Sequence, residues 1–239
     1  MALRCFYCPE LHAGSVTLPE AEALHASKVL RLSVGESLTL MDGMGHTANA
    51  VVETISRRGS ELVCKVDEVL QSPKPQYGIR LYLAPPRAKI MDLVVRFATE
   101  LGVARITPIL CQYGVSKPDG SKEGWLQTAI VAMKQSHNPW LPILDEPVAF
   151  NAALASATEC SFLGAVPATA TTSISTPAPE VCLQKGVALW IGPEGGFSPD
   201  EEKTLLEQGA CPLTVSPCIL RVETAVPALL GALYMLLGK

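Results

Sequence analysis

Residues 189–201 read Leu-Trp-Ile-Gly-Pro-Glu-Gly-Gly-Phe-Ser-Pro-Asp-Glu, and this stretch decides the fold. The apolar run 187–191 predicts a buried strand that ends at a Gly-Pro pair. We expect Ser198 to cap a helix whose first position is Pro199, with Glu201 completing a capping box. The stretch therefore predicts a strand, a glycine-containing loop and the start of a helix.

The loop between this strand and this helix contains the pair Gly195 and Gly196. Because glycine has no side chain, the main-chain amides at these positions can approach and bond a ligand. A tight turn in an ordinary α/β unit would use the same residues. The loop alone leaves both interpretations open.

A second segment, residues 214–225, reads Thr-Val-Ser-Pro-Cys-Ile-Leu-Arg-Val-Glu-Thr-Ala. It predicts a short apolar strand and a bend at the Ser-Pro pair, followed by a helix at residues 225–237. Arg221 and Glu223 stand among apolar and small residues near this bend. Charged side chains in such a place need either partners or a function.

Together the two segments resemble the paired signature of the ribosomal small-subunit RNA methyltransferase E family. The signature is Ile-Gly-Pro-Glu-Gly-Gly at residues 191–196 and Leu-Arg-Val-Glu-Thr-Ala at residues 220–225. Shorter matches lie at residues 25–31, 99–103 and 134–136, so the resemblance extends over nearly the whole chain. The family belongs to the SPOUT class of knotted methyltransferases, and its members methylate N3 of a uridine in 16S rRNA of the small ribosomal subunit.

The resemblance implies an α/β fold in two domains. Residues 1–72 would form a small PUA-like β-barrel domain that binds RNA, and residues 73–239 a SPOUT-type α/β methyltransferase domain with a trefoil knot. The polar, proline-containing segment 71–78 marks the boundary. A homodimer is also implied, with the helix at residues 225–237 as its interface, although the same apolar stripe would suit a core.

The residue pattern also separates two halves of the chain. Short strands are predicted first, at residues 5–7, 15–18, 37–41, 48–55 and 61–69, with one helix at residues 19–30. Strands and helices then alternate, with strands at residues 79–84, 105–110 and 160–166 and helices at residues 90–101 and 125–135. This alternation predicts a mostly parallel sheet covered by helices.

The composition is that of a folded, slightly acidic chain. Of its 239 residues, 48% are hydrophobic and 18% charged, and the net charge is -4. This balance argues against a uniformly basic coat for nucleic acid, but it is compatible with a local basic patch. The N-terminus lacks the apolar core of a secretory signal and no apolar run is long enough to span a bilayer, so a cytoplasmic location is expected.

The eight cysteines are scattered along the chain. In a reducing compartment they are expected to be small buried hydrophobic residues. Only Cys5-x-x-Cys8 has the spacing of a metal site, and no second pair accompanies it. No metal is expected.

S-adenosylmethionine is the methyl donor that the resemblance implies. The sequence has neither the G-x-G-x-x-G motif of dinucleotide-binding folds nor a P-loop. In the family, the loops at three strand ends surround the cofactor. The cofactor-binding residues would be Leu163, Val166, Pro167, Ile191, Gly192, Pro193, Glu194, Gly195, Gly196, Ser216, Ile219, Leu220, Thr224 and Ala225.

Arg221 and Glu223 are the catalytic candidates. Methylation of N3 requires that its proton is lost and that the developing negative charge is stabilised. Arg221 suits the second role, because a guanidinium stays charged and donates two parallel hydrogen bonds. Glu223 could orient Arg221 or accept the proton, and a salt bridge that seals the helix start is the structural alternative. Glu194 could organise its loop or face the sulfonium.

The RNA-binding candidates are five cations and one amide, namely Lys28, Arg31, Arg87, Lys89, Arg96 and Gln135. Arg57 and Arg58, in a predicted loop, are secondary candidates. A solvated helix face would carry the same charges. Relatives usually have a lysine at the position of Arg96, and they have a glutamate and an arginine near the positions of Lys134 and His137.

Two other functions fit the same residues. One is a SPOUT methyltransferase that acts on a ribose hydroxyl or on transfer RNA. The other is a non-catalytic RNA-binding assembly factor, which would keep the fold but would not bind S-adenosylmethionine.

Overall fold

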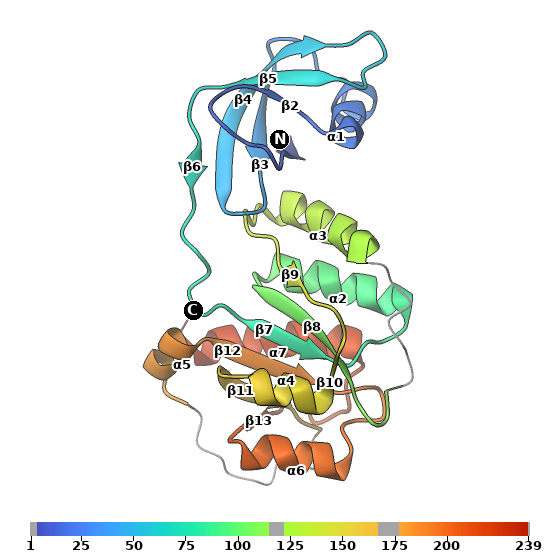
Figure 1. Ribbon diagram of the computed structural model, residues 1–239, viewed down its shortest axis with the longest axis vertical. Coiled ribbons are helices and arrows are strands. Elements are labelled where there is room, and N and C mark those ends of the chain that lie inside the picture. The colour runs from blue at the N-terminus through green and yellow to red at the C-terminus, as the bar shows by residue number, and fades with distance from the viewer. Residues whose placement is uncertain (1–3, 115–121, 167–176, 239) are drawn as a thin grey trace. The chain divides into compact units, whose positions relative to one another are not determined.

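The computed structural model describes residues 4–114, 122–166 and 177–238. The chain folds as two compact units, each described below by itself (Figure 1). The first unit joins Met1–Lys74 to Ile130–Leu141, and the second joins Pro75–Ala129 to Pro142–Lys239.

The first unit is built on a six-stranded sheet. Its strands follow the order β1 (Cys5–Tyr7), β3 (Ser37–Met41), β4 (His46–Ile55), β5 (Leu62–Val66) and β2 (Gly14–Thr17), and β6 (Leu70–Gln71) pairs with β4. The β1–β3 pair is parallel and all the others are antiparallel. The five predicted strands are present, but the strand expected at residues 61–69 ends at Val66, because the acidic pair Asp67 and Glu68 interrupts its apolar run.

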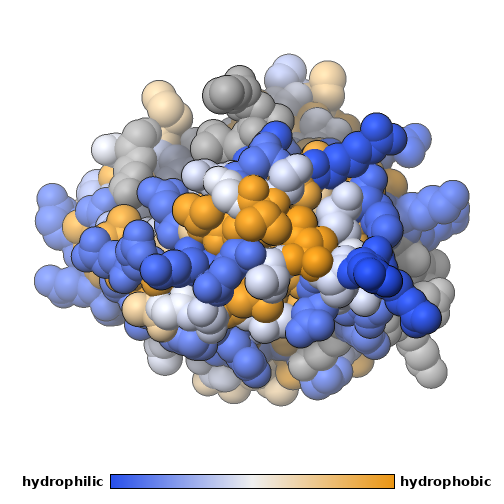
Figure 2. Space-filling model, turned by 90° about the horizontal axis from the view of Figure 1, so that it is seen from above, coloured by the Kyte–Doolittle hydropathy of each residue, from blue (hydrophilic) through white to orange (hydrophobic). Residues whose placement is uncertain are grey.

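The core of this unit follows from the alternation of side chains along β4. Ala48, Ala50 and Val52 are buried, and the residues between them face outward. The face of this unit seen in Figure 2 has hydrophobic residues near its centre and hydrophilic residues around them.

The helix predicted at residues 19–30 is present in two parts, the α-helix α1 (Glu20–Leu24) and the π-helix η1 (His25–Val29). The amide of Leu30 donates to the carbonyl of His25, which is a π-type hydrogen bond. Arg31 then adopts φ 54°, a left-handed conformation that ends the helix. Sequence periodicity cannot distinguish such a widened turn from an ordinary one.

The turn between β3 and β4 is hydrogen-bonded to the segment that follows α3 (Lys122–Ser136). Asp42 accepts hydrogen bonds from the amides of Met44 and His46, and Gly45 donates to the carbonyl of Pro139. A Cβ added at Gly45 would lie 2.2 Å from the ring of Trp140. The Trp140 indole therefore leaves space only for a glycine at position 45.

The second unit is built on a seven-stranded sheet in which every pair is parallel. Its order is β10 (Val148–Ala149), β8 (Arg105–Leu110), β7 (Arg80–Leu83), β12 (Val187–Ile191), β11 (Cys160–Gly164) and β13 (Cys211–Leu213), and β9 (Ile143–Leu144) pairs with β8. This confirms the predicted α/β architecture. Because all strands run the same way, their carboxyl ends meet at one edge of the sheet.

Helices cover both faces of this sheet. Trp190 stacks on Tyr82 with ring centroids 3.9 Å apart, and they share a core with Phe150 of α4 (Phe150–Ser156) and Leu205 of α6 (Pro199–Glu207). On the other side, α7 (Val222–Leu236) packs against α2 (Ala88–Glu100) and β12. Figure 1 shows α4 in front of the strands and α7 behind them.

The last part of the chain departs from the sequence prediction. The prediction of a strand that starts at residue 214 is wrong. Strand β13 ends at Leu213, and no described residue between Leu213 and Arg221 is in a strand. The final helix begins at Val222, three residues earlier than expected. Helices α4 and α5 (Pro179–Lys185) were not predicted.

Cys5 and Cys8, the pair with the spacing of a metal site, have raised thiol pKa values. Burial raises the pKa of the Cys5 thiol to about 11 and also raises the pKa of Cys8, so both remain protonated near neutral pH. Among the described residues there is no group of three or more His, Cys, Asp and Glu side chains that could hold a metal ion. In the same part of the chain, no helix combines the length and the apolar character that a membrane crossing requires.

The Gly45–Trp140 contact predicts the effect of one methyl group. Gly45→Ala should lower the free energy of unfolding by about 2 kcal/mol more than Gly35→Ala, because only the first Cβ overlaps a ring. The two glycines have similar backbone strain, with φ +93° and +88°, and nothing lies within 4 Å of a Cβ at Gly35. Urea unfolding of both variants measures the difference, and equal losses would contradict the interpretation.

Candidate functional site

A cavity of about 1040 Å³ lies in the second unit, where the chain leaves β11, β12 and β13 at the carboxyl edge of the sheet. The start of α7 and the segment before α2 complete its wall. This position is where open parallel sheets bind ligands.

The loop after β12 forms one wall of the cavity and is turned by its glycines. Gly196 adopts φ 77° and its amide donates to the carbonyl of Pro193 at 2.8 Å. A Cβ at Gly192 would lie 3.0 Å from the amide nitrogen of Phe197 and from its ring. Main-chain atoms therefore form the cavity wall at Gly192 and Gly196. A side chain would be crowded at the first position and would strain the backbone at the second.

The helix that follows this loop starts as the sequence predicted. The Ser198 amide donates to Glu201 Oε2 at 2.9 Å, and the Glu201 amide donates to Ser198 Oγ at 3.3 Å. Pro199 occupies the first helical position. The predicted capping box is confirmed, and it anchors the far end of the glycine loop.

The floor of the cavity includes a glycine that sequence reasoning missed. A Cβ at Gly164 would lie 2.9 Å from Leu229 Cδ1 of α7 and 3.3 Å from the Trp190 carbonyl oxygen. The residue ends β11 directly beside β12. The sequence offered only a glycine inside the strand predicted at residues 160–166.

The structure brings most of the predicted cofactor residues together. Those that line the cavity are Leu163, Val166, Ile191, Gly192, Pro193, Glu194, Gly195, Gly196, Ser216, Ile219, Leu220 and Ala225. Thr224, in the first turn of α7, does not line it, so this part of the prediction is wrong. Pro167 lies outside the described residues.

Arg221 and Glu223 both line the cavity at the start of α7. Arg221 is the exposed N-cap residue of that helix, and Glu223 is half-buried in its first turn. Between described residues, neither side chain has an ion pair within 4.0 Å, so the two do not form the salt bridge considered as the alternative. The guanidinium is available to a ligand.

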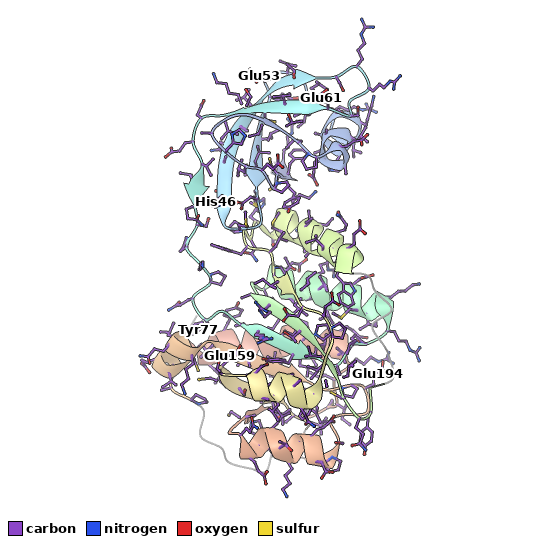
Figure 3. All side chains as sticks on the ribbon, in the orientation of Figure 1. His46, Glu53, Glu61, Tyr77, Glu159 and Glu194 are labelled. Carbon is purple, nitrogen blue, oxygen red and sulfur yellow. The ribbon has the colours of Figure 1, made fainter. Side chains whose placement is uncertain are left out.

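Other charges stand at the same cavity. Arg87 and Lys89 line it from the N-terminal end of α2, and Glu194 and Glu202 line it from the glycine loop and α6. Figure 3 shows Glu194 at one edge of the sheet, opposite the edge that bears Tyr77 and Glu159. Arg87 and Glu194 also line a smaller adjoining cavity of about 290 Å³.

The other RNA-binding candidates lie elsewhere. Arg96 pairs with Glu100 at 3.7 Å and lies over the Phe97 ring, and it does not line the cavity. Lys28, Arg31 and Gln135 belong to the first unit, where all three are exposed. The structure therefore gathers Arg87 and Lys89 at the cavity but not the remaining four.

A tyrosine beside the glycine loop was also missed. Tyr113 follows β8, is 46% exposed, and has its Cβ 3.6 Å from a Cβ built on Gly195. The capping residue Glu201 holds its loop, since Oε1 accepts from the Gln112 amide at 2.9 Å. The sequence predicted only the cap, because this second bond joins residues that are 89 positions apart.

Comparison with protein families gives two matches. A model of the RNA methyltransferase domain matches residues 72–234, and a model of the RNA methyltransferase PUA domain matches residues 18–63. The first match covers more than half of the chain and includes the whole cavity.

Solved structures show the same fold at full length. A Legionella pneumophila protein in complex with its bound cofactor SAM is 30% identical, with a TM-score of 0.85 over 98% of both chains. A ribosomal RNA small subunit methyltransferase E from Neisseria gonorrhoeae, bound to S-adenosyl methionine, is 25% identical, with a TM-score of 0.84 over 98% of both chains.

Two curated relatives are also named ribosomal RNA small subunit methyltransferase E. The ribosomal RNA small subunit methyltransferase E of Aquifex aeolicus is 30% identical over 97% of this chain and 99% of the relative. That of Synechocystis is 28% identical over 99% of this chain and 78% of the relative. The chain belongs to the ribosomal RNA small subunit methyltransferase E family.

Proposed function

We propose that the protein transfers a methyl group from S-adenosylmethionine to N3 of a uridine in 16S rRNA of the small ribosomal subunit, uridine 1498 in the usual numbering. The observation that carries this proposal is the cavity at the ends of β11, β12 and β13, with Arg221 at its wall, a guanidinium that has no ion pair with another described residue. The names of the relatives support the choice of RNA and of reaction.

The residues of the cavity fit the cofactor. Its volume of about 1040 Å³ is sufficient for a nucleoside with an amino-acid tail. Gly164 and Gly192 keep space that a Cβ would fill, and Leu163 and Ile191 supply buried apolar surface. We propose that the cavity-lining residues predicted for the cofactor hold it there, mainly by main-chain groups. When bound, the cofactor supplies a methyl group on a sulfonium.

Arg221 is proposed to stabilise the substrate charge. Uridine N3 becomes a nucleophile when it loses its proton, and the negative charge then spreads to the flanking carbonyl oxygens. A guanidinium can donate two parallel hydrogen bonds to the edge of the base that carries this charge. The positive end of the α7 dipole adds to the stabilisation of the charge. For Glu223, which lines the cavity two residues from Arg221, we propose the orientation of Arg221 once RNA is bound rather than proton acceptance.

The predicted cations that take no part in the methyl transfer itself are proposed to bind RNA. Arg87 and Lys89 would hold the nucleotides near the target base, and Lys28, Arg31 and Gln135 would contact RNA on the first unit. Arg96 is retained as a candidate, since an exposed ion pair such as that with Glu100 is weak and can open to a phosphate.

Further features of the resemblance are proposed as well. They are domains at residues 1–72 and 73–239, closure of the first sheet into a PUA-like barrel, a trefoil knot in the second domain, a homodimer and a cytoplasmic location. Insertion of β12 between β7 and β11 supports the knot. Exposure of Met235 (77%) and Leu236 (45%) at the end of α7 supports the dimer interface.

Removal of the guanidinium should abolish most of the activity. Arg221→Ala is expected to lower the rate of methyl transfer to small subunits by about 100-fold to 1000-fold, the usual effect of losing one charge-stabilising donor. Lys203→Ala, on exposed α6, is the control and should keep the wild-type rate. The rate is measured as 3-methyluridine formed per minute, and an unchanged rate for Arg221→Ala would refute the catalytic role.

The glycine wall should control cofactor affinity. Gly192→Ala places a methyl group 3.0 Å from the Phe197 main chain, so the loop must shift and S-adenosylmethionine should bind at least about 10-fold more weakly. Gly209→Ala has strained backbone at φ +84° but no close neighbour, and it should bind the cofactor normally. Titration calorimetry compares the two, and equal affinities would exclude this wall as the cofactor site.

Nucleoside analysis separates the proposed function from its alternatives. Cells that lack the protein should lose 3-methyluridine from 16S rRNA and keep their other modified nucleosides. Loss of a ribose-methylated nucleoside, or of a nucleoside from transfer RNA, would indicate a different SPOUT activity. An unchanged nucleoside profile would indicate a non-catalytic factor.

A further inference from the structure

A small cavity of about 290 Å³ adjoins the large one at the carboxyl edge of the sheet in the second unit. Its walls come from the segments that follow two neighbouring parallel strands, β7 and β12, and from the first residue of α7. The Ala84 amide donates to the Ile191 carbonyl at 2.9 Å, so the two segments are joined where they leave the sheet. The place of the small cavity is therefore fixed by the sheet itself.

The two cavities have a wall in common. The residues that line both are Arg87, Pro193, Glu194 and Val222, and we call them the shared wall. Figure 3 shows Glu194 at this edge of the sheet. The large cavity is the proposed cofactor site. With the cofactor there, a group in the small cavity would meet it at the shared wall.

The small cavity combines an apolar lining with a charged rim. Ala84, Pro85 and Pro86 are buried, whereas Arg87 and Glu194 are exposed. Proline has no amide hydrogen, so this lining offers apolar surface to the faces of a ring. Enzymes that modify a base hold it between apolar or aromatic side chains and read its edge by hydrogen bonds. The small cavity has both of these properties.

The two charged residues of the rim have fixed main chains and unpaired side chains. Glu194 is a central residue of the tight turn that the Gly196 amide closes on the Pro193 carbonyl at 2.8 Å. The Arg87 carbonyl accepts from the Met91 amide at 3.0 Å. Neither charged side chain has an ion pair within 4.0 Å with another described residue. A carboxylate and a guanidinium thus line one cavity without neutralising each other.

We propose that the small cavity receives the pyrimidine ring of the target uridine and that Glu194 accepts the proton of its N3. The inference rests on the proposed function, and it supplies the proton acceptor that the reaction requires. Uracil presents one N–H between two carbonyl groups along the edge that is methylated. A carboxylate accepts from the N–H, and a guanidinium such as that of Arg87 donates to a flanking carbonyl. Cytosine has no hydrogen on N3, so its lone pair would face the carboxylate and the base would be rejected.

Atoms and electrons balance in this step. The N3–H bond breaks, its proton passes to a Glu194 carboxylate oxygen, and its electron pair stays on N3. That pair forms the bond to the methyl carbon as the bond from this carbon to sulfur breaks, and the electrons of the broken bond remain on sulfur, which loses its positive charge. Glu194 then releases the proton to solvent, to which its side chain is exposed.

The other charged groups of the site have different places. Four of them line only the large cavity, namely Lys89, Glu202, Arg221 and Glu223. Tyr113 lies beside Gly195 and lines neither cavity. Within the described part of the chain, Glu194 is therefore the one carboxylate that the two cavities share.

Glu194→Gln tests the proton transfer, because an amide keeps the shape of the carboxylate but does not take the proton. Single-turnover formation of 3-methyluridine in small subunits should be slower by about 100-fold or more near neutral pH. At higher pH the rate of the variant should rise about 10-fold per pH unit, because N3 then loses its proton to hydroxide, while the wild-type rate stays nearly constant. Glu180→Gln, on exposed α5, is the matched control and should keep the wild-type rate and pH profile.

A more acidic base gives an independent readout. Fluorine withdraws electrons, so N3 of 5-fluorouridine loses its proton more readily than N3 of uridine. Small subunits reconstituted with 5-fluorouridine in 16S rRNA should raise the Glu194→Gln rate by at least about 10-fold and the wild-type rate by much less. An equal loss of rate with both RNAs would indicate that Glu194 only shapes its loop, and would overturn the inference.

Titration calorimetry with S-adenosylmethionine separates the remaining outcomes. Glu194→Gln keeps the main chain of the loop, so its affinity for the cofactor should equal that of the wild type. Weaker cofactor binding would overturn the inference and place the carboxylate at the sulfonium. A wild-type rate in the variant, or a slower rate with the wild-type pH profile, would overturn it as well. A wild-type protein that forms no 3-methyluridine would instead refute the proposed function.

Discussion

The burial of one strand determines where the site can be. Strand β12 lies between β7 and β11, and all five of its residues are buried. Trp190 fills one face of the sheet by stacking on Tyr82, while α7 contacts the strand from the other face. A chain that leaves such a strand must turn at once within a crowded layer, and at Gly192 it has no space for a side chain. The hollow beside the loop follows from that constraint.

The charges of the site are arranged differently from those of the rest of the second unit. Arg80 is held by Thr107, Asp145 and Glu159, and Arg105 also pairs with Asp145. These pairs occupy the amino-terminal edge of the sheet, where they stabilise the fold. At the opposite edge Arg221 has no such partner among the described residues. A guanidinium kept unpaired beside a hollow is suited to a ligand that brings its own negative charge.

Local signals predicted local structure well. The boundaries of β3, β8 and β12 and the Ser198 capping box are as expected, because each depends on a few neighbouring residues. The failures have tertiary causes. The widened turn of η1 and the early end of β13 depend on packing that no short window contains. The contact of Tyr113 with the glycine loop was invisible for the same reason, and roles for Arg221 and Glu223 came from a resemblance rather than from periodicity.

The return of Ile130–Leu141 to the first unit means that the chain is interleaved rather than modular. Lys134 forms its ion pair with Glu22, and the Trp140 indole donates to the Pro73 carbonyl. A protein cut at residue 72 would leave this lysine without its partner. Recombination that exchanges the N-terminal segment alone would separate this ion pair in the same way.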